Sequence, residues 1–113
     1  MDIHTQKKAE FTVVEIHGRF CLGPDTESFR DTILGLVASG DKNILVDLRD
    51  VPMLDSSGLG TLVRCHTAVQ QAGGKYKLLA PSGFVRRTLE LVRLDSLFEI
   101  YDDEKTAAAS FLF

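Results

Sequence analysis

The feature that most constrains the fold is a regular alternation of short apolar segments with longer segments of helical periodicity. The apolar run at residues 43–48 is long enough for a buried strand and too short for a helix. Strands are also predicted at residues 11–18, where polar and apolar residues alternate and β-branched residues are frequent, and at residues 75–80 and 97–101. Between them, and again after the last one, apolar residues recur every three or four positions, as on one face of a helix. Strands that alternate with helices imply parallel pairing, because a parallel pair needs a long crossover connection.

A short stretch before the first strand, Ile3 to Gln6, can pair with it as an antiparallel hairpin. We therefore expect an α/β fold: a mixed β-sheet, mostly parallel with an antiparallel start, flanked by about four α-helices. Neither a linker nor an internal repeat interrupts the pattern, so residues 1–113 are expected to form a single domain.

Capping residues predict where the helices begin and end. Side-chain oxygens at an N-cap accept hydrogen bonds from the first free backbone amides, and glycine favours the C-terminal stop. We expect the first helix to start at Asp25, Thr26 or Ser28 and to end at Gly40, and the second to start at Asp55 or Ser56 and to end at Gly73-Gly74. The third helix should start at Ser82, and a last helix should start at the acidic residues 102–104 and continue to Phe113. The third helix should place Phe84, Val85, Leu89 and Val92 on its apolar face.

Composition excludes several classes of function. With a formal net charge of −3, the 113-residue chain lacks the basic footprint of a protein that binds DNA or RNA. It has no apolar run near the ~20 residues of a membrane helix and no signal-peptide pattern, so we expect a cytoplasmic protein without membrane insertion. Cys21 and Cys65 share no metal-ligand spacing and are expected to be reduced thiols, and the three histidines form no ligand cluster.

The most unusual segment is Leu54-Asp55-Ser56-Ser57-Gly58-Leu59-Gly60, between a buried strand and a helix. It places two hydroxyls, a carboxylate and two glycines where a helix presents free backbone amides and a partial positive charge. Such a place suits an anion. An ordinary capped helix start explains the same residues, and composition and spacing leave both interpretations open.

The motifs of common enzymes are incomplete in this chain. The run from Gly35 to Gly40 has the glycine spacing of a phosphate-binding loop, but Asp41 stands where that motif needs lysine. The nucleophile motif of serine hydrolases is Gly-x-Ser-x-Gly. Ser56 has Gly58 two residues after it, but Leu54 stands where the earlier glycine is needed. His66 falls on the apolar face of its own helix, as a packed histidine does. We therefore expect no catalytic residues, although a small hydrolase or nucleotide-binding enzyme that uses Ser57 is the competing hypothesis.

The Asp-Ser-Ser-Gly-Leu-Gly run, after a strand that ends in Val46-Asp47-Leu48, closely resembles the STAS domain of bacterial anti-sigma factor antagonists. The resemblance continues through Gly73-Gly74 and residues 82–91 and 97–103, and so covers nearly the whole chain. It implies a mixed sheet flanked by helices, a domain that is not an enzyme, and no obligatory cofactor.

The resemblance also implies a mechanism of partner switching. In that family the unmodified domain binds an anti-sigma factor that is also a serine kinase, and thereby frees the sigma factor. The kinase phosphorylates the second serine of the run, which is Ser57 here, with Ser56 as the less favoured alternative. The phosphorylated form no longer binds, and a serine phosphatase restores it.

The partner is expected to contact the start of the helix and the loop before it. Thr61 and Arg64 are included because they lie about one and two turns beyond Ser57 on the same helical face, whereas Leu59, Leu62 and Val63 should be core. The expected contact residues are Asp25, Leu54, Asp55, Ser56, Ser57, Gly58, Thr61 and Arg64.

One segment departs from the family pattern. The family commonly has Gly-Glu-Leu-Asp after its early strand, with that aspartate close to the phosphorylated serine. Here the segment from Gly18 to Asp25 replaces it, with Arg19 at the Glu position and Cys21 at the Asp position. Asp25 is the candidate substitute for the missing carboxylate, and Cys21 is expected to pack, with a redox role left open. The departure keeps a second function open, that of a STAS interaction module in another partner-switching, stress-signalling, transporter or lipid-trafficking complex.

Overall fold

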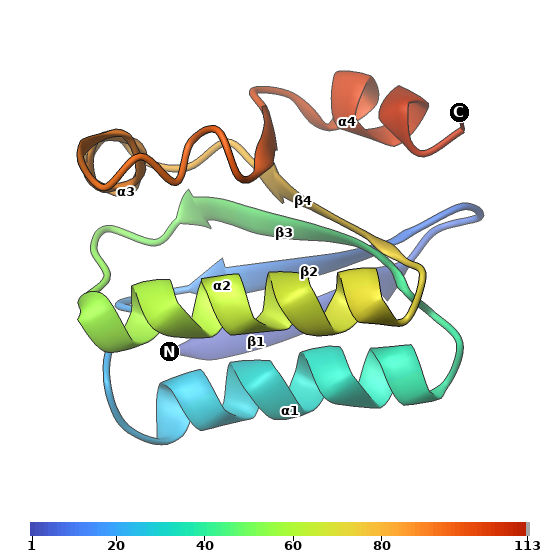
Figure 1. Ribbon diagram of the computed structural model, residues 1–113, viewed down its shortest axis with the longest axis horizontal. Coiled ribbons are helices and arrows are strands. Elements are labelled where there is room, and N and C mark those ends of the chain that lie inside the picture. Colours follow the sequence, from blue (N-terminus) through green and yellow to red (C-terminus); the bar gives the residue numbers. More distant parts are fainter. Residues whose placement is uncertain (113) are drawn as a thin grey trace.

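The computed structural model describes residues 1–112, which form a five-stranded sheet with four helices. The strands lie in the order β1-β2-β3-β4-β5; β1 and β2 pair antiparallel and the others parallel. This arrangement confirms the expected mixed α/β fold (Figure 1). In chain order the elements are β1 Asp2–Lys7, β2 Thr12–His17, α1 Pro24–Ala38, β3 Asn43–Asp50, α2 Ser56–Gln71, β4 Lys75–Leu79, α3 Gly83–Leu91, β5 Glu99–Tyr101 and α4 Glu104–Ser110.

Two apolar clusters hold the layers together, one on each face of the sheet. Because successive strand residues point to opposite faces, neighbouring positions of one strand belong to different clusters. Val14 joins the larger cluster, which contains the buried faces of α1 and α2, and Val13 joins the smaller one, which Ala107 and Phe111 complete from the C-terminal helix. Figure 1 shows α1 and α2 side by side on one side of the sheet and α4 on the other.

Several expected boundaries are confirmed. Asp55, Ser82 and Asp103 cap α2, α3 and α4, and each side chain accepts a hydrogen bond from a backbone amide three residues on. Gly40 follows α1 with a φ of 87°, a left-handed conformation that glycine adopts at little cost. The expectation for the last helix reaches Phe113, which lies outside the described residues.

The start of α1 differs from the prediction. The helix begins at Pro24, with Gly23 as N-cap and no side-chain capping bond. Pro24 explains the earlier start, because proline suits the first helical position, where the backbone amide has no partner. The hydroxyl of Thr26 instead donates to the carbonyl of Gly23 at 3.0 Å, so Asp25, Thr26 and Ser28 all lie inside the helix.

Two core expectations are revised. Val85 and Leu89 of α3 are buried, but Phe84 and Val92 are largely exposed, because the sheet covers only part of the apolar arc of this helix. Of the three α2 residues expected in the core, Leu62 is fully buried, while Leu59 and Val63 are partly buried against it. His66 packs against the rings of Tyr76 and Phe98, and this burial lowers the pKa of its imidazole.

No helix within residues 1–112 is long and apolar enough to cross a membrane. Within the same residues, no group of three or more histidine, cysteine or acidic side chains is arranged to hold a metal ion.

Candidate functional site

The first turn of α2 is built around the carboxylate of Asp55. Its Oδ1 accepts a hydrogen bond from the amide of Gly58 at 2.8 Å, and its Oδ2 accepts one from the amide of Leu22 at 2.9 Å. These two backbone donors favour the charged form of Asp55 and so hold its pKa below the usual value; the amide of Leu22 has the larger effect of the two. One side chain therefore caps α2 and also fixes the loop that precedes α1.

The loop of residues 18–23 lies directly against this turn. Phe20 is fully buried, its amide donates to the carbonyl of Met53 at 3.0 Å, and it forms a parallel bridge with Leu54. The close approach requires Gly58 to lack a side chain, since a Cβ there would overlap the carbonyl oxygen of Phe20. The loop is thus held at three points against the start of α2.

The two serines differ in their surroundings. Ser56 is exposed at the first position of α2, and Ser57 is partly buried at the second. The hydroxyl of Thr61 donates to the carbonyl of Ser57 at 2.8 Å and accepts from Nη2 of Arg64 at 3.3 Å. The guanidinium of Arg64 is thereby drawn back toward the N-terminal turn, where the helix dipole is positive.

Three of the expected contact residues lie below the surface. Leu54 and Gly58 are buried, and Thr61 is only 3% exposed. Thr61 lies one turn beyond Gly58, on the face of α2 that also carries the buried Cys65, so this face is closed. These residues support the site from beneath, and its surface is formed by the exposed Ser56 and Arg64 with the partly buried Ser57 and Asp55 beside them.

Asp25 is in the first turn of α1, and among the described residues no hydrogen bond or ion pair joins it to Asp55 or Ser57. The loop instead presents a backbone amide, that of Leu22, to the carboxylate of Asp55. Sequence reasoning missed Leu22, whose side chain is 79% exposed, because nothing local marks a hydrogen bond across 33 positions. It also missed that the hydroxyl of Ser82 donates to the carbonyl of Val51 at 2.7 Å, which ties the start of α3 to the loop before α2.

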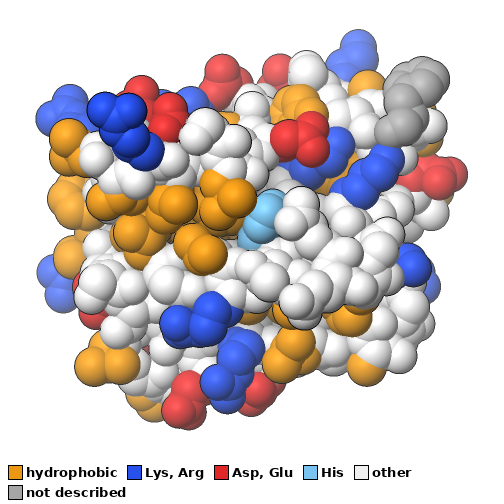
Figure 2. Space-filling model, in the orientation of Figure 1, with side chains coloured by type: hydrophobic (Ala, Val, Ile, Leu, Met, Phe, Trp, Pro, Cys, Tyr) orange, Lys and Arg blue, Asp and Glu red, His pale blue; other side chains and the backbone are white. Residues whose placement is uncertain are grey.

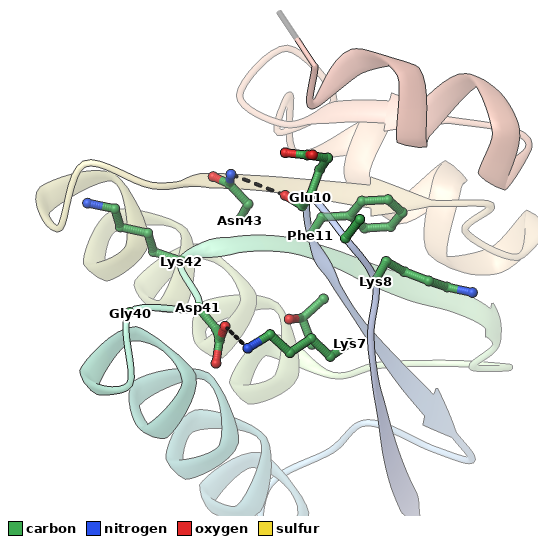
Figure 3. Close-up of a pocket in the computed structure, with 10 residues that line it drawn as sticks. Lys7, Lys8, Glu10, Phe11, Gly40, Asp41, Lys42 and Asn43 are labelled. Atoms are coloured by element: carbon green, nitrogen blue, oxygen red, sulfur yellow. Dashed lines mark hydrogen bonds and ion pairs between the residues drawn. The ribbon is translucent and has the colours of Figure 1, made fainter.

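A hollow of about 270 Å³ lies at the opposite end of the sheet, where the β1–β2 hairpin meets the start of β3. Four of its lining residues pair with one another: Nζ of Lys7 lies 3.1 Å from Oδ1 of Asp41, and the side-chain amide of Asn43 donates to the carbonyl of Glu10 at 3.3 Å (Figure 3). None of the candidate site residues lines it.

Comparison with known proteins agrees with this geometry. The family model of the STAS domain matches residues 2–107. The chain belongs to the STAS domain family. A Thermotoga neapolitana protein, named as a candidate anti-sigma factor antagonist, is 38% identical to this STAS domain over 63 residues. That match covers 56% of this chain and 56% of the relative, so it spans little more than half of either protein.

Solved structures share the fold of this STAS domain. The crystal structure of a candidate anti-sigma factor antagonist from Thermotoga maritima has a TM-score of 0.91 at 22% identity, and the match covers 98% of this chain and 95% of that one. The anti-sigma factor antagonist SpoIIAA in its unphosphorylated form has a TM-score of 0.75 at 18% identity over 98% of this chain and 97% of its own. The phosphorylated form of SpoIIAA, from Bacillus, also has a TM-score of 0.75, at 19% identity, over 96% of this chain and 99% of its own.

Proposed function

We infer that this STAS domain is an anti-sigma factor antagonist. In its unphosphorylated form it binds an anti-sigma factor with serine kinase activity and so releases a sigma factor. The kinase phosphorylates Ser57, which ends binding, and a serine phosphatase restores the active form. The names of the relatives support this role, as does the existence of SpoIIAA in phosphorylated and unphosphorylated forms. The role also implies that the protein acts in the cytoplasm.

The observation that carries the proposal is the position of Ser57 in the first turn of α2, one residue from the exposed Ser56 and two from the capping Asp55. Phosphorylation adds about −1.5 to −2 charge and three acceptor oxygens at neutral pH. The positive end of the helix dipole stabilises such a charge by roughly 0.3–1 kcal/mol at an exposed site. The phosphorylated domain should therefore stay folded.

Binding responds differently from folding. A partner that covers a neutral serine hydroxyl must, after phosphorylation, desolvate a dianion that lies close to the carboxylate of Asp55. An unpaired charge buried in an interface is costly, so a local change at Ser57 is sufficient to end binding. No rearrangement of the domain is needed.

The test is the affinity of the protein for the kinase-type anti-sigma factors purified from the same organism, measured by calorimetry for wild type, Ser57→Ala and Ser57→Asp. We expect wild type and Ser57→Ala to bind alike and Ser57→Asp to bind at least about tenfold more weakly. Ser56→Ala is the matched control and should still accept phosphate from the kinase. Equal affinity across wild type, Ser57→Ala and Ser57→Asp would rule out the switch.

The departure in the loop of residues 18–25 favours a second candidate, an interaction module in a complex without a kinase. In this loop Asp55 meets the backbone amide of Leu22, and Asp25 is not joined to the site. A stable partner that has no kinase activity, together with Ser57 unmodified in protein taken from cells, would support this candidate.

A further inference from the structure

Helix α3 buries only half of its apolar arc. Its apolar residues Val85 and Leu89 pack into the large core cluster, but Phe84 is 54% exposed and Leu91 is 78% exposed. Phe84 and Leu91 are seven positions apart and so lie on one face of the helix, two turns from each other. A helix that carries more apolar surface than the sheet can cover leaves a face for something else to cover.

Exposed apolar side chains concentrate at this end of the molecule. Five of the seven large hydrophobic residues that are exposed within residues 1–112 belong to α3, to the segment that follows it, or to the loop bonded to Asp55. We call this set the α3 surface, and it consists of Leu22, Phe84, Leu91, Val92 and Leu97. Figure 2 shows hydrophobic side chains gathered between α3 and α2, at the left of the view.

The α3 surface adjoins the serine site. The bond from Ser82 to the carbonyl of Val51 holds the start of α3 beside the loop that leads into α2, and the bond from Leu22 to Asp55 holds Leu22 beside the same turn. On α2 itself, Ser56, Leu59 and Val63 share one face, and the last two are only partly buried. This face of α2 therefore carries apolar surface next to the serines.

A partner that covers Ser57 must also cover the surface around it. A specific interface buries about 800 Å² on each partner, which is about one-eighth of the 6087 Å² accessible surface of this chain. We propose that the α3 surface is a second contact region for the same anti-sigma factor that covers Ser57, with Leu91 and Phe84 as its apolar anchors; the proposal rests on the function inferred above. The exposed charges around it are mixed, Arg87 and Arg93 with Glu90 and Asp95, as in the polar rim of an interface.

The two contact regions, the α3 surface and the serine site, define the chemistry that the partner must present. Opposite α3 the anti-sigma factor should present an apolar surface, and opposite Ser57 it should present groups that tolerate a neutral hydroxyl but not a phosphate. Both parts would then contribute to one affinity: loss of an apolar anchor should weaken binding of the unmodified protein, and a phosphate on Ser57 should weaken binding even when the anchors are present.

The experiment measures the affinity of the kinase-type anti-sigma factor for Leu91→Ser and Phe84→Ser in the unphosphorylated full chain. Leu34→Ser on α1 is the matched control, since Leu34 is also exposed but lies outside the α3 surface. We expect each α3 variant to bind about tenfold more weakly or worse, Leu91→Met to bind like wild type, and Leu34→Ser to be unchanged. Unaltered circular dichroism and thermal midpoints confirm that the variants fold.

The outcomes separate this proposal from the function on which it rests. If Ser57→Asp weakens binding but Leu91→Ser and Phe84→Ser do not, the α3 proposal is wrong and the switch stands. If no kinase-type anti-sigma factor binds the wild type, both are wrong. If the chain forms a dimer in sedimentation that Leu91→Ser abolishes while anti-sigma binding stays unchanged, the α3 surface belongs to a second copy and the proposal is overturned.

Discussion

The carboxylate of Asp55 accepts a hydrogen bond at 2.9 Å from the backbone amide of Leu22, which lies 33 positions earlier in the chain. The same carboxylate caps α2 through Gly58. The loop before α1 and the turn that carries Ser57 are therefore one unit, joined by a single ionised side chain.

The Asp55 bonds predict a pH-dependent stability. Because the folded state lowers the pKa of Asp55 below its ordinary value of 3.8, the stabilisation by this carboxylate is present above that value and is lost as pH falls through the folded pKa. We expect Asp55→Asn to lower the thermal midpoint at about pH 7 and the difference from wild type to shrink below about pH 4. The capping Asp103 is present in both proteins, so its own acid dependence cancels.

The measurement is a series of thermal unfolding curves for wild type, Asp55→Asn and Asp95→Asn across this pH range. Asp95 is exposed and serves as the control for removal of one negative charge. A difference between wild type and Asp55→Asn that stays constant down to the lowest pH would contradict the assigned role of the carboxylate.

Gly58 and Gly60 form a matched pair on one helix. A methyl group at Gly58 would overlap the backbone carbonyl of Phe20, so we expect Gly58→Ala to destabilise the fold by about 1–3 kcal/mol or more. At Gly60 the nearest atom is Nη1 of Arg64 at 3.2 Å, the mobile end of a side chain. Gly60→Ala should gain up to about 1 kcal/mol from helix propensity. Denaturant unfolding measures both, and equal effects would contradict the close approach of the loop.

Arg93 occupies a position that favours glycine. It has a φ of 61° after α3, where the amide of Leu94 donates to the carbonyl of Leu89 at 2.8 Å and that of Arg93 donates to Glu90 at 3.1 Å. This is a Schellman ending, and a side chain in the left-handed conformation costs about 1–2 kcal/mol. We expect Arg93→Gly to raise the free energy of unfolding, and Arg93→Ala to leave it nearly unchanged. A less stable Arg93→Gly variant would show that the arginine side chain contributes to the fold.

The two cysteines should differ in reactivity. Burial raises the pKa of Cys65 to about 11, so almost none of it is thiolate at neutral pH, whereas Cys21 is partly exposed in the loop. A disulfide reagent should therefore label one thiol of the folded protein quickly and the second only after unfolding. In Cys21→Ser the fast reaction should disappear, and a fast reaction that persists there would contradict the burial of Cys65.

What the sequence predicted well depends on short-range chemistry. The strands and helices follow from apolar periodicity, and the caps Asp55, Ser82 and Asp103 follow from side-chain oxygens three residues before a helical amide. The features it missed depend on neighbours distant in sequence. Periodicity assigns Phe84 to an apolar face but cannot tell how far the sheet extends beneath it, and no local pattern indicates that Leu22 meets Asp55.

The most direct test of the account is the affinity of the anti-sigma factor for this protein before and after the partner kinase has phosphorylated it, with the modified residue mapped by mass spectrometry. The account predicts one phosphate on Ser57, an affinity at least about tenfold weaker in the phosphorylated form, and full recovery after treatment with a serine phosphatase. An affinity that is the same for the unmodified and the phosphorylated protein would contradict it.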